Sequence, residues 1–171
     1  MVALSLIREI APVITALICA GKVSSGIGAE LGSMKVTEQI DAMEVAAINP
    51  FKYLVVTRIL ATTLMVPILV IYADAVGIYG GYMGINIHNE VNLFRYFSQV
   101  GESITFLDIF PAIIKTFFFG FFIGIIGCYK GFTADNGTAS VGKAANSAVV
   151  TASLTIFIID MLAVQVTDLL F

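Results

Sequence analysis

Four long apolar segments constrain this chain more than any other feature of its sequence. They cover residues 2–29, 53–85, 106–129 and 145–170. Each exceeds the ~20 residues with which an α-helix crosses the ~30 Å hydrocarbon core of a bilayer. Backbone groups in lipid must hydrogen-bond within the segment, and the alternating pattern of a membrane β-barrel is absent. The sequence predicts an all-α, polytopic membrane helix bundle with four transmembrane helices, forming one domain over residues 1–171.

The composition supports this class and excludes others. Of the 171 residues, 58% are hydrophobic and 12% are charged, whereas soluble domains are about 45–50% apolar and about 25% charged. Nine Lys and Arg against twelve Asp and Glu provide no basic surface, so we expect no nucleic-acid partner. Cys19 and Cys128 stand far apart in apolar segments. We therefore expect two small buried hydrophobic residues and no metal site.

The basic residues of the connecting segments predict the orientation in the membrane. The first and third connections carry six of them: Lys22, Lys35, Lys52, Arg58, Lys130 and Lys143. The second connection has only Arg95. Connections rich in Lys and Arg remain in the cytoplasm. We therefore expect both termini of this chain on the outer side, which is the periplasm for a protein of the cell inner membrane.

Ionisable residues within the apolar segments are the most informative side chains. Arg8 and Glu9 lie in the first segment, Asp74 in the second, Lys115 in the third and Asp160 in the fourth. Such charges are costly in a membrane and usually face the bundle interior or a water-filled cavity. Measured from the nearest cytoplasmic basic residue, they lie roughly 20–26 Å along their helices. This places a polar belt at one depth, in the outer half of the bilayer.

Two interpretations of the belt remain open, and both can hold. In the first, Lys115 pairs with Asp160 or Glu9 and fixes the register of the helices. In the second, which we favour, the charges line a cavity that receives the polar group of a substrate. Beside the belt the segments are strongly apolar, which suits an amphipathic molecule with its head at the belt and its tails alongside. Asp74 is the least secure member, because the long second segment can carry it to the outer interface.

The first cytoplasmic connection contains a short predicted helix over residues 36–48. Thr37 is its expected N-cap and Pro50 its expected stop. Ile40, Met43 and Ala47 form an apolar stripe at helical spacing. An acidic edge is formed by Glu38, Asp41 and Glu44. Helices that lie on membranes favour Lys and Arg on the polar face, so we expect this acidic helix to bind a protein partner.

Small residues recur at a spacing of four: Ser24, Gly28 and Gly32; Gly77 and Gly81; Gly80 and Gly84; Gly120 and Gly124. This spacing lets helix backbones approach closely, in a bundle or a dimer. Pro12 and Pro67 lie inside spans, where we expect kinks. There is no Walker A motif and no hydrolase motif. We therefore expect no catalytic residues, no cofactor bound by this chain, and no ATP hydrolysis by it.

The sequence also resembles a known family. Residues 8–17 (REIAPVITAL), 20–23 (AGKV) and 29–44 (AELGSMKVTEQIDAME) are similar to the signature of the MlaE/YrbE-type permeases. Residues 49–58 continue the similarity, as do Gly131-Phe132, Gly142-Lys143-Ala144 and the stretch from Ala148 to Asp160. These permeases are the membrane subunits of ABC transporters that work with MCE-domain proteins. Relative to the family, the chain is N-terminally short by an interfacial helix and one span.

The resemblance implies a homodimeric permease in the inner membrane, with a P-loop ATPase subunit that binds ATP and an MCE-domain protein on the outer side. It implies movement of phospholipids between inner and outer membranes. The helix at 36–48 would be the coupling helix, with Glu38, Ile40, Asp41, Met43 and Glu44 toward the ATPase. Arg8, Glu9, Lys115 and Asp160 match the charged cavity residues of the family. Two alternatives are an ion-coupled secondary transporter, with Glu9, Lys115 and Asp160 as a relay, and a non-transporting membrane scaffold subunit.

Overall fold

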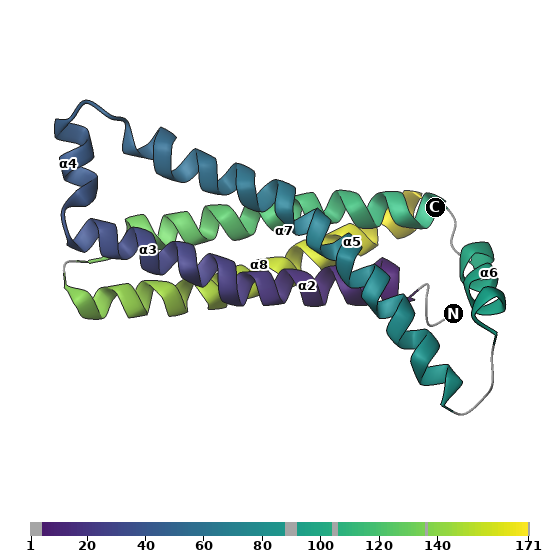
Figure 1. The fold of residues 1–171 in the computed structure, drawn as a ribbon. Helices are drawn as coiled ribbons and strands as arrows, with labels where there is room; N and C mark the ends of the chain where they lie inside the picture. Colours follow the sequence, from purple (N-terminus) through teal and green to yellow (C-terminus); the bar gives the residue numbers. More distant parts are fainter. Residues whose placement is uncertain (1–4, 88–91, 104–105, 136, 171) are drawn as a thin grey trace.

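A computed structural model describes residues 5–87, 92–103, 106–135 and 137–170. Within these ranges every regular element is a helix, and none is a strand (Figure 1). Four helical stretches are long and apolar enough to cross a membrane: Leu6–Val36, Phe51–Asn86, Ile109–Phe132 and Thr138–Thr167. The predicted helix bundle with four spans is confirmed.

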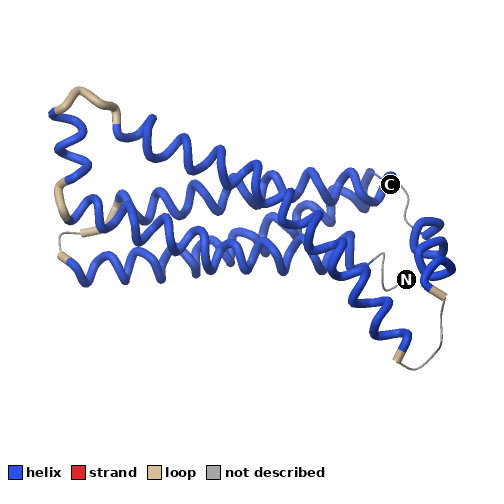
Figure 2. The backbone as a smooth tube through the Cα atoms, in the orientation of Figure 1, coloured by secondary structure: helices blue, strands red, loops and turns tan. Residues whose placement is uncertain are grey.

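The first span is one continuous helix with two π-helical turns, at Leu6–Ile10 and Ala20–Ser24. The α-helical parts between and after these turns are α2 (Ala11–Cys19) and α3 (Ser25–Val36). The second span begins with a π-helical turn at Phe51–Val56 and continues as α5 (Thr57–Asn86). The third and fourth spans are α7 (Phe106–Phe132) and α8 (Thr138–Leu170). Figure 2 shows how little of the chain lies outside these helices.

Three of the helices extend beyond their predicted apolar segments at the end of the bundle that carries α4 (Gln39–Val45; Figure 1). The first continues to Val36 rather than residue 29, α7 to Phe132 rather than 129, and α8 begins at Thr138 rather than 145. These extra turns leave the apolar sequence pattern but still pack on one another. A Cβ on Gly131 would come within 2.6 Å of the Leu31 Cβ. Helix–helix contact therefore prolongs the spans beyond their lipid-like stretches.

Small residues allow this close packing, as their spacing predicts. A Cβ on Gly28 would lie 3.3 Å from the Cβ of Ala148, which brings α3 against α8. A Cβ on Gly120 of α7 would lie 2.5 Å from the carbonyl oxygen of Thr62, which brings α7 against α5. The Gly80 and Gly84 pair behaves differently, because open space surrounds both positions in the described chain.

The second span leaves the bundle as it proceeds. In Figure 1, α5 crosses the other helices obliquely and its C-terminal half diverges from them. Pro67 lies inside α5, where it removes one backbone hydrogen bond. Pro12 follows the π-helical turn within the continuous first helix, so it also lacks an N–H that the helix would otherwise use. Beyond Pro67, Tyr72 and Val76 are exposed, which is the expected state of a lipid-facing surface.

The short cytoplasmic helix is present, but its ends differ from the prediction. Helix α4 covers only Gln39–Val45, not 36–48. Thr37 does not cap it; its Oγ1 donates to the Ser33 carbonyl oxygen at 2.9 Å and so closes the preceding helix. Pro50 does not stop it either, because Pro50 opens the next helix. The backbone turns instead at Glu38 and Ala47, each with a left-handed φ of 58°.

Helix α6 (Leu93–Ser103) was not predicted. It lies at the opposite end of the bundle from α4 (Figure 1). Tyr96 fixes it, since its hydroxyl donates to the Ile78 carbonyl oxygen at 3.3 Å and its ring lies 5.6 Å from that of Tyr82. The sequence did hold a signal, because Leu93, Phe97 and Val100 recur at helical spacing.

Candidate functional site

Lys115 is the most buried charged side chain in the described chain. It lies in α7, and only 6% of its side chain is exposed. An isolated ammonium group in an apolar interior is strongly destabilising unless opposite charges and hydrogen bonds surround it. Lys115 therefore requires carboxylate partners from neighbouring helices.

Two carboxylates meet this requirement. The Lys115 ammonium donates to Asp160 Oδ1 at 3.0 Å and to Glu9 Oε2 at 3.3 Å. The three residues come from α7, from α8 and from the first helix, so they join segments far apart in the sequence. We call Glu9, Lys115 and Asp160 the ionic triad. With both carboxylates ionised it carries one more negative than positive charge.

The two carboxylates of the triad differ in exposure. The Asp160 side chain is 19% exposed, while that of Glu9 is 40% exposed. Arg8 precedes Glu9 and lines the same small crevice as Glu9 and Lys115, together with Thr167 of α8. Arg8 has an interaction of its own within the protein. The open side of the cluster is therefore the side of the first helix.

Asp74 does not join this cluster. It lies in α5, and among the described residues no hydrogen bond or ion pair connects it to the triad. Its Oδ1 is buried without a hydrogen-bond partner in the part of the chain that the structure describes. A similar depth was predicted for Asp74, but its side chain does not lie beside the triad. Its assignment to a substrate cavity stays a prediction.

An apolar groove of about 520 Å³ runs between α7 and α8 and includes Lys115 in its lining. Its wall is formed by Phe110, Ile114, Phe118, Leu162 and Val166. Phe119 is not part of this surface, because it is fully buried in the core with Ile123 and Ile156. In the described part of the chain, Lys115 is therefore the one ionic group in an otherwise largely apolar lining. Lys115 thus pairs with two carboxylates and also lines a groove, so features of both interpretations of the belt are present at this residue.

Helix α4 divides the predicted partner-binding residues into two groups. Ile40 is only 2% exposed and packs with Leu31, Leu54 and Val55 in a cluster at the α4 end of the bundle. Met43 packs against the same cluster, whereas Ala47, the third residue of the predicted stripe, is exposed. Direct contact of Ile40 with a partner conflicts with its burial, so Ile40 and Met43 anchor α4 to its own bundle.

The acidic edge of α4 does face outward. Glu38, Asp41 and Glu44 are exposed. Lys35 lies 3.8 Å from Asp41 and partly balances this edge. Exposed apolar residues follow it, with Val45 at 89%, Ile48 at 48% and Phe51 at 62% exposure. Val45 ends α4, and Ile48 and Phe51 lie beyond it, so the predicted apolar stripe includes none of the three.

A further ion pair lies at the α4 end of the bundle. Arg58 of α5 lies 2.7 Å from Glu30 of α3 and also donates to the Leu54 carbonyl oxygen at 3.0 Å. Nothing in the sequence marks Glu30 as its partner, since the two residues lie on different helices. The pair holds the two helices that flank α4.

Comparison with known proteins now decides the family. A model of the MlaE permease family matches residues 1–166 of the chain. The chain belongs to the MlaE permease family. A probable ABC transporter permease protein of Rickettsia typhi is 40% identical over 172 residues, covering 100% of this chain and 65% of that protein.

Two further relatives of this MlaE-family chain lie outside that genus. A probable ABC transporter permease protein of Synechocystis sp. is 41% identical over 158 residues, covering 92% of the chain and 60% of the relative. The protein TRIGALACTOSYLDIACYLGLYCEROL 1, chloroplastic, of Arabidopsis thaliana is 34% identical over 160 residues, covering 94% and 46%. The chain thus spans 65% or less of the length of these three relatives. It is a multi-pass membrane protein of this family.

Proposed function

We propose that this MlaE-family chain is a membrane permease subunit of an ABC transporter that moves phospholipids between the inner and outer membranes. The proposal places it in the inner membrane as a homodimer, with a separate P-loop ATPase at the cytoplasmic end and an MCE-domain protein outside. The observation that carries it is the apolar groove of about 520 Å³ that has Lys115 in its lining. A groove of this size lies within the range of ~300–1,000 Å³ of ligand pockets.

The groove and the ionic triad together match an amphipathic ligand. Acyl chains fit against Phe118 and Leu162, where they replace lipid contacts without exposing polar groups. A phosphate in the groove competes with Asp160 and Glu9 for the Lys115 ammonium. A cationic headgroup pairs with Glu9, the more exposed carboxylate. Lys115 is then neutralised by Asp160 and Glu9 in the empty state and by the phosphate in the bound state.

ATP-driven motion would enter through α4. Its exposed acidic edge and the apolar residues Val45 and Phe51 form the outward surface. Ile40 ties this surface to α3 and to the start of the second span. Movement of α4 is thereby passed to the helices that carry the site.

The lipid proposal can be tested with a matched pair of phenylalanines. Phe118 lines the groove and Phe157 does not, yet each is 53% exposed. A photoreactive phenylalanine analogue is placed at each position, and the purified complex is washed with detergent before irradiation. We expect phospholipid to be captured at position 118 and not at 157, because only the groove retains lipid after washing. Equal capture at both positions, or none at 118, contradicts the proposal.

The coupling surface is tested by charge reversal. We expect D41K/E44K to remove the ATPase from the purified complex, since both carboxylates are exposed on α4. D135K is the matched control, because Asp135 is an exposed acid in the other cytoplasmic connection. The measurement is the amount of ATPase that co-purifies. Undiminished co-purification with D41K/E44K removes α4 as the contact.

A further inference from the structure

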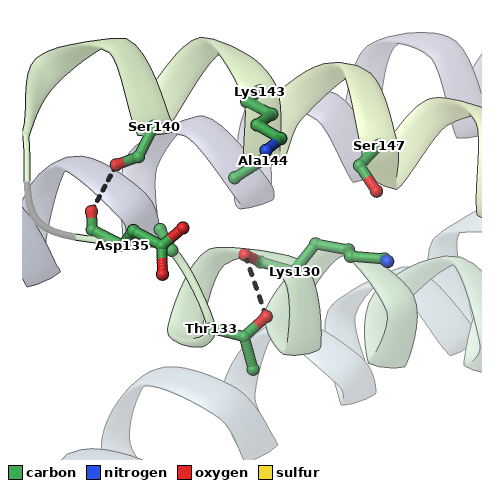
Figure 3. Close-up of a pocket in the computed structure, with 8 residues that line it drawn as sticks. Lys130, Thr133, Asp135, Ser140, Lys143, Ala144 and Ser147 are labelled. Carbon is green, nitrogen blue, oxygen red and sulfur yellow. Dashed lines mark hydrogen bonds between the residues drawn. The ribbon is translucent and has the colours of Figure 1, made fainter.

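The cytoplasmic ends of α7 and α8 enclose a second, smaller pocket that the proposed function does not use. Its volume is about 160 Å³, and its polar lining includes Lys130, Thr133, Asp135, Ser140, Lys143 and Ser147 (Figure 3). It shares no residue with the apolar groove. The two cavities therefore lie at different places along the same pair of helices.

The two lysines of this pocket, Lys130 and Lys143, form no ion pair in the part of the chain that the structure describes. By contrast, Lys35, Arg58 and Lys115 each do. Figure 3 shows both side chains extending into the space between the helices. Asp135 is the one acid in the lining, so the pocket carries one net positive charge.

The hydroxyl groups of the pocket differ in availability. Ser140 Oγ donates to the carbonyl oxygens of Asp135 and Gly137 and so closes the loop before α8. Thr133 Oγ1 donates to the Tyr129 carbonyl oxygen at 2.8 Å. Ser147 is half-buried, and no hydrogen bond of its hydroxyl is found in the described chain. Two ammonium groups and one hydroxyl are thus left as donors without an acceptor.

We infer that this pocket binds a phosphate group, carried by the headgroup of a phospholipid of the cytoplasmic leaflet. Phosphate oxygens accept strong charge-assisted hydrogen bonds from ammonium groups. Basic pockets between transmembrane helices on the cytoplasmic side commonly hold anionic headgroups. The volume of 160 Å³ admits a headgroup phosphate, while the acyl chains remain outside along the helices. This inference is independent of the outer groove and of transport.

The test uses the full chain in detergent with dioleoyl phosphatidylglycerol as the probe, and native mass spectrometry counts the lipids retained. The variant is K130Q/K143Q. Its matched control is K22Q/K52Q, which removes two exposed lysines outside the pocket. We expect K130Q/K143Q to retain one lipid fewer than wild type and to bind phosphatidylglycerol at least about tenfold more weakly, as expected for lost charged hydrogen bonds. K22Q/K52Q retains the wild-type number.

Two competitors identify the source of the phosphate. Dioleoylglycerol, which lacks phosphate, leaves the pocket-dependent lipid in place if the headgroup is what binds. Displacement by millimolar inorganic phosphate supports a phosphate site and assigns it to a soluble anion instead of a lipid. Equal losses in K130Q/K143Q and K22Q/K52Q, or no loss in either, overturn the inference, because general surface charge or other sites then explain the binding.

Discussion

Lysines occupy two contrasting regions of this molecule. Within the bundle, Lys115 is 6% exposed and contacts two carboxylates. Near the connection of α7 and α8, Lys130 and Lys143 line a pocket and form no ion pair in the described chain. The difference follows from desolvation. A buried ammonium must be neutralised by the protein itself, whereas an ammonium at the boundary with water and headgroups is solvated and stays available for ligands.

The largest effect that this comparison predicts comes from removing Lys115. K115M leaves Glu9 and Asp160 without their shared cation, and breaking a buried ion pair typically costs ~3–5 kcal/mol. We expect a marked fall in the midpoint of thermal unfolding in detergent. The triple variant E9Q/K115M/D160N removes all three charges and should recover most of this loss. If K115M unfolds like wild type, the triad does not stabilise the bundle.

A smaller effect separates the two carboxylates. Asp160 is 19% exposed and 3.0 Å from the Lys115 ammonium, while Glu9 is 40% exposed and 3.3 Å away. D160N should therefore destabilise the protein more than E9Q, by ~1–3 kcal/mol for the aspartate. Water compensates the loss at Glu9 more readily. Thermal unfolding of the two variants side by side measures the order, and the reverse order would show that Glu9 is the principal partner.

The smallest effect on stability is expected at the cytoplasmic pocket. K130Q and K143Q remove charges that form no ion pair in the described chain, so we expect changes within ~0.5 kcal/mol. The same unfolding measurement checks this expectation in parallel with K115M. A large loss in either variant would mean that the lysines support the fold and would erase the contrast with Lys115.

Sequence reasoning located the spans and named Asp160 and Glu9 as candidate partners of Lys115, but it did not separate Asp74 from them. The rise per residue gives the height of Asp74 and Lys115 along their helices. It does not give the side of the helix they face. In the first span, π-helical turns at Leu6–Ile10 and Ala20–Ser24 change the rotation per residue. The grouping of Glu9, Lys115 and Asp160 without Asp74 therefore depends on packing that no local pattern records.

The short cytoplasmic helix shows a second limit. Two residues of its predicted apolar stripe, Ile40 and Met43, pack with Leu31 and Leu54 of the same chain, whereas Ala47 is exposed. Periodicity shows that a face is buried and not what buries it. The residues that remain exposed, such as Val45, lie where the helix ends, and helix ends are the least certain feature of any sequence pattern.

The two left-handed residues at Glu38 and Ala47 have a mechanical consequence. They fold the chain sharply at both ends of α4, while Ile40 is wedged into the cluster between the first and second spans. The position of the short helix is therefore fixed by the turns at its two ends and by the packing of Ile40. A force on α4 would either separate Ile40 from this cluster or move both spans together, which is the rigid link that the proposed coupling function requires.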